Sequence, residues 1–371
     1  MRIAIDIRKI NEFGIGTYIW NLVRNLAVVD TNNEYFLIGS DRNYQELGPL
    51  PASFKQFLQP EGSSMWRDQF SLPLALRKLD ADIVHVTHHE SPIAVPSKLV
   101  VTIHDCVHVM FPPEDASRFQ NYRKYVHTRR VVNRANQVIA VSNSTKDDLI
   151  SLFNLAPSKV SVIHNALDSR FTLGPDENPA QVLERYQLKD PFILYSGRIR
   201  PHKNLHRLIE AFAVLKSELA DSGPLRNLKL IIIGDELSQH QYLRLTVVRS
   251  GVQQDVRFFG FVPYPTLRVF YQSAAMFAFP SLYEGFGLPP LEAMANRTAV
   301  LASDTSSLPE VLEDAALLVN PENVFEIARG MKTILLDAAV RQRLIEKGAQ
   351  QVTKFSWQLA AKRVVETYQR V

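Results

Sequence analysis

The 371-residue chain contains one cysteine, Cys106, which excludes an internal disulfide framework and indicates a reducing compartment. No apolar run reaches the ~18–20 residues that a membrane-spanning helix requires. Residues 1–8 alternate like a strand and lack the apolar core of a signal peptide. Low-complexity tracts and short repeats are also missing. We therefore expect a cytoplasmic protein that is at most peripheral to a membrane.

Strong charge of one sign is missing from the chain as a whole but not from one segment. The net charge is +4 and the pI about 9.0, too weak an excess to indicate a nucleic-acid partner. Residues 116–146 contain no acid but seven Lys or Arg, and apolar side chains recur there at three- and four-residue steps. This pattern predicts an amphipathic helix with a basic face over residues 118–134. Such a face is either simply solvated or a contact to anionic lipid or an acidic ligand.

Length and patterning predict an α/β protein of two domains. A chain of 371 residues exceeds what one compact core usually supports. Strand-like runs alternate with helical stretches, which is typical of parallel, doubly wound sheets. A polar stretch at 168–177 is expected to separate the domains, and residues 138–146 should run from a strand into a capped helix. Other expected strands are 3–7, 34–39, 83–87, 99–103, 160–165, 191–197, 228–234, 256–262, 276–280 and 300–304.

Two candidate ligand loops lie in the first half. Gly14 and Gly16 follow the first expected strand, but the third glycine of the dinucleotide fingerprint is missing, so a nicotinamide cofactor is not indicated. A plain tight turn fits these glycines equally well. The strand at 99–103 ends in His104 and Asp105, at the carboxyl end where ligand-binding residues collect. A merely structural, hydrogen-bonded histidine is the alternative there.

Five of the ten histidines lie between His85 and His108. Imidazole is the commonest metal ligand. However, no pair of histidines four residues apart with an acid between them lies on an expected helix. We therefore expect no metal site.

The second half opens with another strand, glycine loop and helix. After Gly197 come Arg198, Lys203 and Asn204, so two cations five residues apart precede a helix start. Arg198 offers a planar fork and Lys203 a compact charge, a combination suited to a diphosphate. Solvated basic residues in a loop are the ordinary alternative.

A second loop in this half carries two acids. Glu284 and Glu292 bracket a Gly-x-Gly segment and two prolines, after the apolar run 276–280. Glycine permits positive φ or close approach of a ligand, and proline suits the first turn of a helix. The free N–H groups at a helix start bind anions or hydroxyls. An ordinary strand–helix connection with two polar acids remains the alternative for this segment alone.

The two segments Gly197-Arg-x4-Lys203-Asn204 and Glu284-x7-Glu292 together resemble the motifs of retaining glycosyltransferases of family 4. The resemblance covers essentially the whole chain. It implies the GT-B fold, with two doubly wound Rossmann-like domains facing a cleft and a C-terminal helix that crosses back to the first domain. The acceptor-side domain would comprise residues 1–170 and 355–371, and the nucleotide-sugar-binding domain residues 171–354.

The resemblance also implies roles for individual residues. Asp105 would hold the tautomer of the adjacent imidazole or face the acceptor hydroxyl. Glu284 would hold donor-sugar hydroxyls, and Glu292 those of the ribose. The catalytic residues would be His104, Glu284, Arg198 and Lys203. The donor-binding residues would be Gly14, Gly16, Gly197, Asn204, Phe259, Gly260, Val262, Gly285, Phe286, Gly287, Leu288 and Glu292.

The implied reaction is transfer of a hexosyl unit from a nucleotide-sugar to a hydroxyl of a saccharide or lipid-linked saccharide, with retained configuration and without a metal or cofactor. The opening at Gly14–Tyr18 and the pair His104-Asp105 are similar to bacterial mannosyltransferases of O-antigen or exopolysaccharide assembly, which favours GDP-mannose. A UDP-sugar donor remains open. A non-catalytic nucleotide- or sugar-binding module and a phosphorylase- or epimerase-like enzyme are the competing hypotheses. Lipid-linked acceptors would agree with contact between residues 118–134 and the inner face of the cell membrane.

Overall fold

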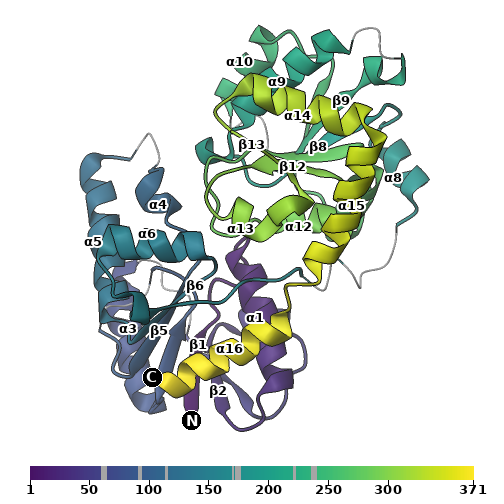
Figure 1. Cartoon of the computed structure of the whole chain (residues 1–371). Helices are drawn as coiled ribbons and strands as arrows, with labels where there is room; N and C mark the ends of the chain where they lie inside the picture. The colour runs from purple at the N-terminus through teal and green to yellow at the C-terminus, as the bar shows by residue number, and fades with distance from the viewer. Residues whose placement is uncertain are drawn as a thin grey trace. The chain divides into compact units, whose positions relative to one another are not determined.

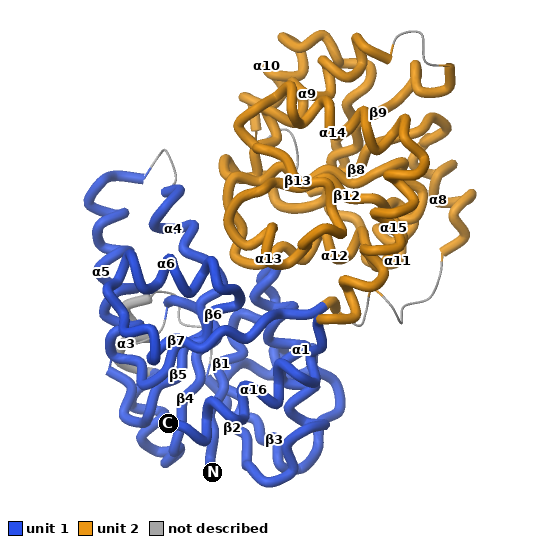
Figure 2. The backbone as a smooth tube through the Cα atoms, in the orientation of Figure 1, with its two compact units in different colours: residues 1–166, 355–371 blue, residues 167–354 orange. Residues whose placement is uncertain are grey.

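The computed structural model describes residues 1–59, 65–90, 94–112, 116–168, 171, 177–219, 223–234 and 240–371, with only the backbone at 65–71. It divides into two units, shown in Figure 2. Unit 1 comprises residues 1–166 and 355–371, and unit 2 comprises residues 167–354. The chain therefore passes from unit 1 to unit 2 after residue 166, four residues before the predicted end of the first domain at residue 170. Most of the expected linker, 168–177, falls outside the described residues.

Unit 1 is built on a parallel sheet with the order β3-β2-β1-β4-β5-β6-β7 (Figure 1). Its central strands are almost continuously apolar because helices cover both faces of a sheet of this type. The strands are β1 (Arg2–Asp6), β2 (Glu34–Gly39), β3 (Phe54–Leu58), β4 (Ile83–Val86), β5 (Lys98–Ile103), β6 (Gln137–Ala140) and β7 (Val160–Val162).

The helices of unit 1 cover this sheet from two sides and form two hydrophobic clusters. The C-terminal helix α16 begins at a Ser356 cap and buries Trp357, Ala361, Val364 and Tyr368 against α1, so it belongs to the core of unit 1. The helices are α1 (Ile15–Val29), α2 (Asp41–Glu46), α3 (Met65–Leu79), α4 (Val107–Met110), α5 (Arg118–Arg134), α6 (Asn143–Phe153), the 3-10 turn η1 (Pro157–Lys159) and α16 (Trp357–Arg370).

The predicted basic helix is α5, and its bounds are those expected. Ser117 caps it: its hydroxyl accepts from the Gln120 N–H at 3.2 Å, and the Gln120 side chain accepts from the Ser117 N–H at 3.0 Å. Such a reciprocal capping box satisfies two donors that the helix itself cannot. Thr128, Val131 and Val132 face inward, which leaves the charged face outside.

Unit 2 contains a parallel sheet with the order β10-β9-β8-β11-β12-β13. Chain order therefore runs outward in both directions from the neighbouring strands β8 and β11. The strands are β8 (Phe192–Ser196), β9 (Lys229–Ile233), β10 (Val256–Phe259), β11 (Met276–Phe279), β12 (Val300–Ser303) and β13 (Leu317–Val319). The helices are α8 (Pro179–Arg185), α9 (Leu205–Glu218), α10 (Gln241–Arg249), α11 (Tyr264–Ser273), α12 (Leu288–Ala295), α13 (Leu308–Leu312), α14 (Val324–Leu336) and α15 (Ala338–Val352), with 3-10 turns η2 (Pro201–Lys203), η3 (Gly223–Asn227) and η5 (Glu313–Ala315).

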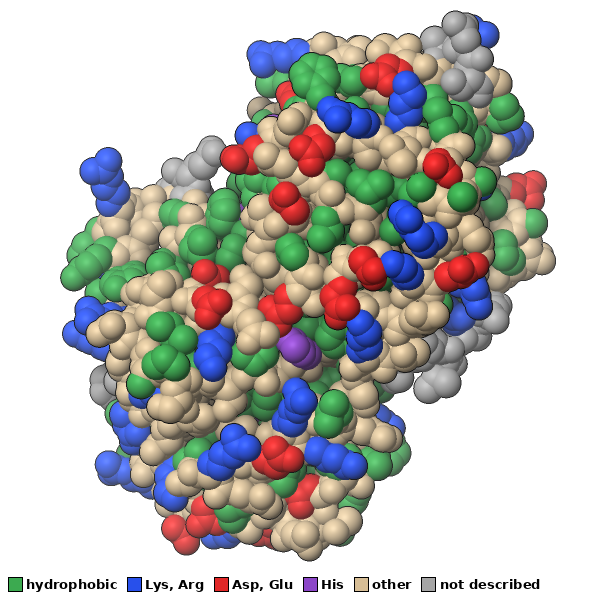
Figure 3. Space-filling model, viewed as in Figure 1, with side chains coloured by type: hydrophobic (Ala, Val, Ile, Leu, Met, Phe, Trp, Pro, Cys, Tyr) green, Lys and Arg blue, Asp and Glu red, His purple; other side chains and the backbone are tan. Residues whose placement is uncertain are grey.

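The surface carries mixed charge. On the face drawn in Figure 3, Lys and Arg side chains are interspersed with Asp and Glu, in keeping with the small net charge. Among the described residues, no helix is both long enough and apolar enough to cross a membrane.

Candidate functional site

The two predicted motifs of unit 2 meet at one point of the sheet. The strand order reverses between β8 and β11, and in open α/β sheets ligands bind beyond the carboxyl ends of the strands at such a point. Residues 197–204 leave β8, and residues 280–287 leave β11. The Leu282 N–H donates to the His202 carbonyl at 2.7 Å, which joins the two loops directly. Topology therefore brings together segments that are some eighty residues apart in the chain.

Close backbone packing shapes the loop after β8. The Gly197 N–H donates to the Ile233 carbonyl at 3.0 Å, so the loop starts beside the end of β9. A Cβ on Gly234 would lie 2.2 Å from the Gly197 carbonyl oxygen, so only glycine fits there. The loop then turns outward, and Arg198 is exposed to solvent. An exposed guanidinium at the switch point can reach a ligand phosphate.

Asn204 has a structural part in this loop. It has a left-handed backbone, with φ 61°, and its side chain is fully buried. The amide donates to the Pro280 carbonyl at 2.9 Å and to the Pro321 carbonyl at 2.7 Å, while the oxygen accepts from Arg207 at 3.0 Å. The prediction that Asn204 contacts the donor is therefore corrected: its amide fastens the loops, and its influence on a ligand is indirect.

Lys203 and Glu284 form an ion pair between the two loops. The Lys203 ammonium lies 2.6 and 2.7 Å from the two carboxylate oxygens, and the side chains are only 16% and 10% exposed. The ammonium also lies 5.4 Å from the centre of the Phe279 ring. Opposite charges that are largely removed from water stabilise each other, and each would be costly if left alone. Lys203, the cation predicted to bind phosphate, and Glu284, the acid predicted to bind sugar hydroxyls, therefore lie side by side.

Hydroxyl groups from the segment after β12 hold the Glu284 loop. The Ser303 hydroxyl donates to the Ser281 carbonyl at 2.6 Å. The Ser306 hydroxyl accepts from the Glu284 N–H at 2.9 Å, and the Ser307 hydroxyl donates to the Glu284 carbonyl at 2.9 Å. Sequence patterns did not predict this clamp, although its signal is visible as the hydroxyl-rich run 303–307 directly after a strand.

The start of α12 offers fewer donors than the sequence suggested. Gly287 precedes the helix with φ +103°, and a Cβ there would lie 2.7 Å from Leu308, so glycine is required on both counts. Of the first three helical residues only Leu288 has an N–H, because Pro289 and Pro290 have none. A ligand at this helix start would meet few backbone donors beyond those of Leu288 and Gly287.

Glu292, on α12, is a largely buried carboxyl group with one tyrosine partner. The Tyr271 hydroxyl donates to its Oε2 at 2.8 Å. Burial raises the pKa of Glu292 to about 7, and the Asp168 carboxylate adds to this rise, while the bond from Tyr271 opposes it. The group therefore titrates near neutral pH, a property typical of functional sites. Neither Tyr271 nor Asp168 was predicted from sequence.

Two of the predicted donor-binding residues at and after the end of β10, Phe259 and Val262, use their side chains for packing. The Phe259 ring contacts Tyr186 and Phe270 at centroid distances of 5.2 and 5.8 Å, and Val262 is buried. The Phe261 ring between them is 74% exposed, so this side chain and the backbone of Gly260 are not taken up by the core.

In unit 1 the predicted glycine loop is explained by local geometry. Gly14 precedes α1 with φ +75°. A Cβ on Gly16 would lie 2.0 Å from the Ile10 carbonyl oxygen, a distance that no side chain tolerates. Both glycines are thus required by the fold. Their contact with a donor stays a prediction.

His104 follows β5 and is held as a neutral imidazole. Its Nε2 donates to the Thr87 carbonyl at 3.0 Å, so Nδ1 is left as an acceptor. Burial lowers the pKa of His104 to about 4. The Asp105 carboxylate instead accepts from the Val107 N–H at 2.9 Å, at the start of α4. The expectation that Asp105 holds the tautomer is therefore wrong, and its position toward the acceptor stays a prediction.

A chain of buried hydrogen bonds connects α16 with the neighbourhood of His104. The Tyr368 hydroxyl lies 2.6 Å from His85 Nδ1, and His85 Nε2 lies 2.8 Å from the Thr102 hydroxyl. Thr102 in turn lies 3.0 Å from the Tyr18 hydroxyl. The Tyr18 ring meets the His104 ring edge-on, with 4.8 Å between centroids. Side chains from α1, β4, β5 and α16 thus form one connected network beside the His104 ring.

Two further histidines of unit 1, His89 and His108, stack on each other. Their ring centroids lie 4.0 Å apart, and the described residues contain no group of three or more His, Cys, Asp or Glu able to hold a metal ion. Two acids of unit 1, Asp80 and Asp82, lie at the amino end of β4. There the Asp82 carboxylate accepts from the Arg2 N–H at 2.7 Å, and the Asp80 carboxylate lies 3.6 Å from the Arg2 guanidinium.

Comparison with known families identifies both halves of the chain. The model for glycosyltransferase family 4 matches residues 14–171, and that for glycosyl transferases group 1 matches residues 181–351. The second match includes both motifs of the switch point.

Similar proteins span either this chain or a larger architecture. The Escherichia coli O-antigen chain mannosyltransferase B is 30% identical over 96% of this chain and 95% of its own length. The serotype-specific mannosyltransferase WbdA of the same species is 31% identical over 82% of this chain, which spans only 38% of WbdA. The structure of Anabaena HepE in complex with UDP and glucose superposes with a TM-score of 0.73 over 100% of both chains, at 20% identity. This chain therefore has the same fold as HepE. Its family matches and its identity to the full-length relative show that the chain belongs to family 4 of the glycosyltransferases, with the GT-B fold.

Proposed function

We propose that this protein is a retaining hexosyltransferase that moves a mannosyl unit from GDP-mannose to a hydroxyl of a saccharide or lipid-linked saccharide. The observation that carries the proposal is the Lys203–Glu284 pair at the switch point, with Arg198 exposed in the same loop. A cation for phosphate and an acid for hydroxyls side by side suit a sugar attached to a diphosphate.

Each side chain has a part in the proposed reaction. As the bond between the anomeric carbon and the diphosphate breaks, negative charge grows on the leaving phosphate. Arg198 and Lys203 would stabilise that charge in place of a divalent metal. Glu284 would accept from sugar hydroxyls, and Glu292 from those of the ribose. The Nδ1 atom of His104, an acceptor in this tautomer, would receive a hydrogen bond from a donor-sugar hydroxyl.

The simplest route to a retained configuration is attack by the acceptor hydroxyl on the same face of the sugar from which the diphosphate departs. A double displacement would instead need a carboxylate nucleophile within roughly 5 Å of the reacting carbon. Glu284 is engaged with Lys203 and assigned to hydroxyl binding, so it supplies no nucleophile in our scheme. The acceptor hydroxyl would instead give its proton to the departing diphosphate oxygen, while its own oxygen bonds to the anomeric carbon.

The identity of the donor rests on the relatives. Mannosyltransferases of Escherichia coli at about 30% identity favour a mannosyl donor. Structural neighbours in complex with UDP and UDP-glucose keep a UDP-sugar as the alternative.

A thermal-shift panel tests donor and chemistry together. We expect GDP and GDP-mannose to raise the melting temperature more than UDP, ADP or their sugar conjugates, equally with and without EDTA. A ligand that binds only the folded protein stabilises it by mass action. A larger shift with UDP-glucose would replace the donor assignment, and loss of the shift with EDTA would refute metal independence. Tight nucleotide binding without turnover of any donor would favour a non-catalytic binding module.

Contact with a membrane surface is the proposed role of α5. Phe119 and Tyr122 are 68% and 64% exposed, and the Arg123 guanidinium lies 6.0 Å from the centre of the Phe119 ring. Exposed aromatics on a basic helix suit the surface of anionic lipid, at the inner face of the cell membrane. Co-sedimentation with phosphatidylglycerol vesicles should fall in Phe119→Ser/Tyr122→Ser but not in Val28→Ser, a matched exposed apolar residue of α1. Equal binding of all three proteins would refute this role.

A further inference from the structure

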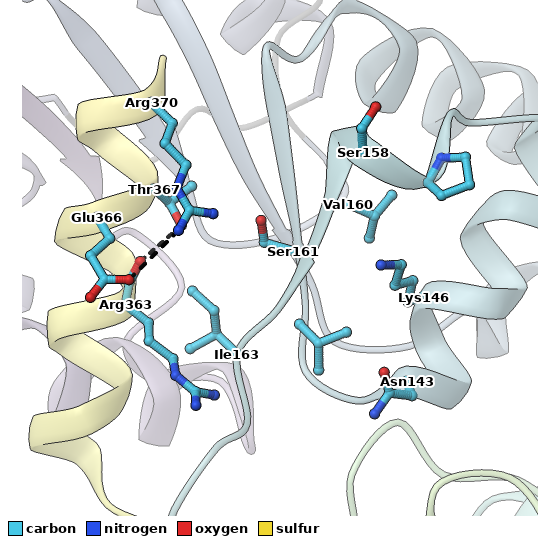
Figure 4. Close-up of a pocket in the computed structure, with 12 residues that line it drawn as sticks. Asn143, Lys146, Ser158, Val160, Ser161, Ile163, Arg363, Glu366, Thr367 and Arg370 are labelled. Atoms are coloured by element: carbon cyan, nitrogen blue, oxygen red, sulfur yellow. Dashed lines mark hydrogen bonds and ion pairs between the residues drawn. The ribbon is translucent and has the colours of Figure 1, made fainter.

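A hollow of about 480 Å³ lies in unit 1 along the open edge of the sheet. Strand β7 is the outermost strand there, and Figure 4 shows side chains of α16 on one side of it and side chains of α6 on the other. We call this hollow the edge groove. Its lining is mostly polar and includes the hydroxyls of Ser158, Ser161 and Thr367. None of its lining residues belongs to the candidate site described above.

Two cations in the edge groove have no partner among the described residues. Neither the Lys146 ammonium nor the Arg363 guanidinium makes a hydrogen bond or ion pair there. The third cation, Arg370, lies 3.8 Å from the only acid of the lining, Glu366. The groove therefore has a net charge of +2, carried by two side chains that approach from separate helices.

Helical spacing explains why these groups face the groove. Arg363, Glu366 and Arg370 recur at three and four residues along α16, so they share one face of that helix. The opposite face, with Ala361 and Tyr368, is buried in the core of unit 1 and fixes the rotation of α16. Lys146 lies near the start of α6, where the helix dipole disfavours a cation. An anion bound between the helices would relieve this cost.

We propose that the edge groove binds a phosphate-bearing ligand, with Lys146 and Arg363 contacting the phosphate oxygens from opposite sides. Cavities of this size accommodate small ligands, and 480 Å³ exceeds the volume of a single phosphate. A diphosphate ester, whether free or the headgroup of a lipid, therefore fits better than an inorganic ion. An acidic peptide added to the sheet edge is less suited, because β7 has only three residues to pair with it.

The proposal is independent of the donor site, and its test keeps the two apart. Equilibrium dialysis measures labelled pyrophosphate bound to the full chain while saturating GDP occupies the switch point of unit 2. In the wild type we expect one pyrophosphate bound per chain in addition to GDP. In the double variant Lys146→Gln/Arg363→Gln, each cation removed should weaken this binding about tenfold. The control Lys362→Gln removes an exposed charge from the same helix outside the groove and should bind as the wild type does. GDP affinity should be equal in all three proteins.

A second arm identifies the source of the phosphate. Flotation with phosphatidylcholine vesicles that contain polyprenyl diphosphate is compared with flotation on phosphatidylcholine alone. Binding to the diphosphate vesicles that is lost in the Lys146/Arg363 double variant, yet kept in Phe119→Ser/Tyr122→Ser, identifies a lipid headgroup. Binding of soluble pyrophosphate alone identifies a free phosphorylated compound. If the double variant matches the wild type in both arms, the proposal is overturned, whatever the outcome for GDP.

Discussion

The ionisation of Glu292 makes the sharpest prediction for the donor site. Burial raises the pKa of this group to about 7 in the free protein. If Glu292 accepts hydrogen bonds from the ribose hydroxyls, the nucleotide binds the ionised form better. Affinity should then rise with pH through neutrality, because only about a tenth of the groups are ionised at pH 6 and about nine tenths at pH 8. We therefore expect GDP affinity to increase roughly tenfold between these values.

The same ionisation has a consequence for stability, with the opposite dependence on pH. The pKa in the folded protein lies above the ordinary value of 4.5, so the unfolded chain loses this proton first. The stability that Glu292 contributes is fully present below pH 4.5 and is lost as pH rises through about 7. Because a tenfold change in a proton-binding constant corresponds to about 1.4 kcal/mol, the loss is roughly 3 kcal/mol. Glu292→Gln should therefore unfold at a higher temperature than the wild type at pH 8, and at a similar temperature at pH 4.5.

Calorimetric titration with GDP at several pH values measures the first effect. The nucleotide phosphate also titrates near pH 6, so the pH dependence is compared between the wild type and Glu292→Gln. The phosphate contributes equally to both, and the difference belongs to Glu292. The variant should bind GDP more weakly at pH 8 and with a shallower dependence. Parallel curves for the two proteins would refute both the shifted pKa and the ribose contact.

Three further substitutions test neighbouring parts of the fold. Lys203→Ala should lower kcat/KM by ~2–4 kcal/mol of transition-state stabilisation, and an unchanged rate would remove the ammonium from the leaving-group site. Glu284→Gln keeps an acceptor for Lys203 but removes its counter-charge, so it should lower the melting temperature and reduce kcat while the protein still folds; wild-type turnover would contradict sugar binding by this acid. Tyr368→Phe leaves a ring nitrogen of the buried His85 without its partner and should cost about 1–3 kcal/mol in urea denaturation, whereas no loss would mean that a water replaces the hydroxyl.

Local pattern predicts much of this molecule. Apolar runs bounded by glycine or proline correspond to the central strands of both sheets, such as β5 and β9, because a strand buried on both faces must be apolar throughout. The capped basic helix 118–134 has the predicted bounds because Ser117 and Gln120 satisfy its first donors locally. Arg198, Lys203 and Glu284 could be selected because the two segments together match the motifs of a known family, whereas each loop alone was also compatible with solvated side chains.

Contacts between distant segments lay beyond this reasoning. Lys203 meets Glu284 only because β8 and β11 are neighbours, and periodicity does not reveal strand order. Asn204 looked like a ligand contact for the same reason: its carbonyl partners, at Pro280 and Pro321, follow in the chain by 76 and 117 residues. From sequence alone, a polar side chain beside a functional motif is interpreted as a ligand contact, because its partner elsewhere in the protein is not visible.

The donor site is most simply understood as three loops fastened to one another rather than as a set of separate ligand contacts. Residues 197–204 are tied to 280–287 through Leu282 and Asn204, and residues 303–307 hold 280–287 through four hydroxyls. Most of these bonds end on backbone atoms, so the loops keep their path when the Lys203 or Glu284 side chain is exchanged. Groups held in this way need little reorganisation when charge develops on a leaving phosphate, which is how fixed cations lower a barrier. Ser307 is not assigned a contact with the donor. Ser307→Ala should nevertheless lower kcat, because it releases the carbonyls of Glu284 and Phe286 together.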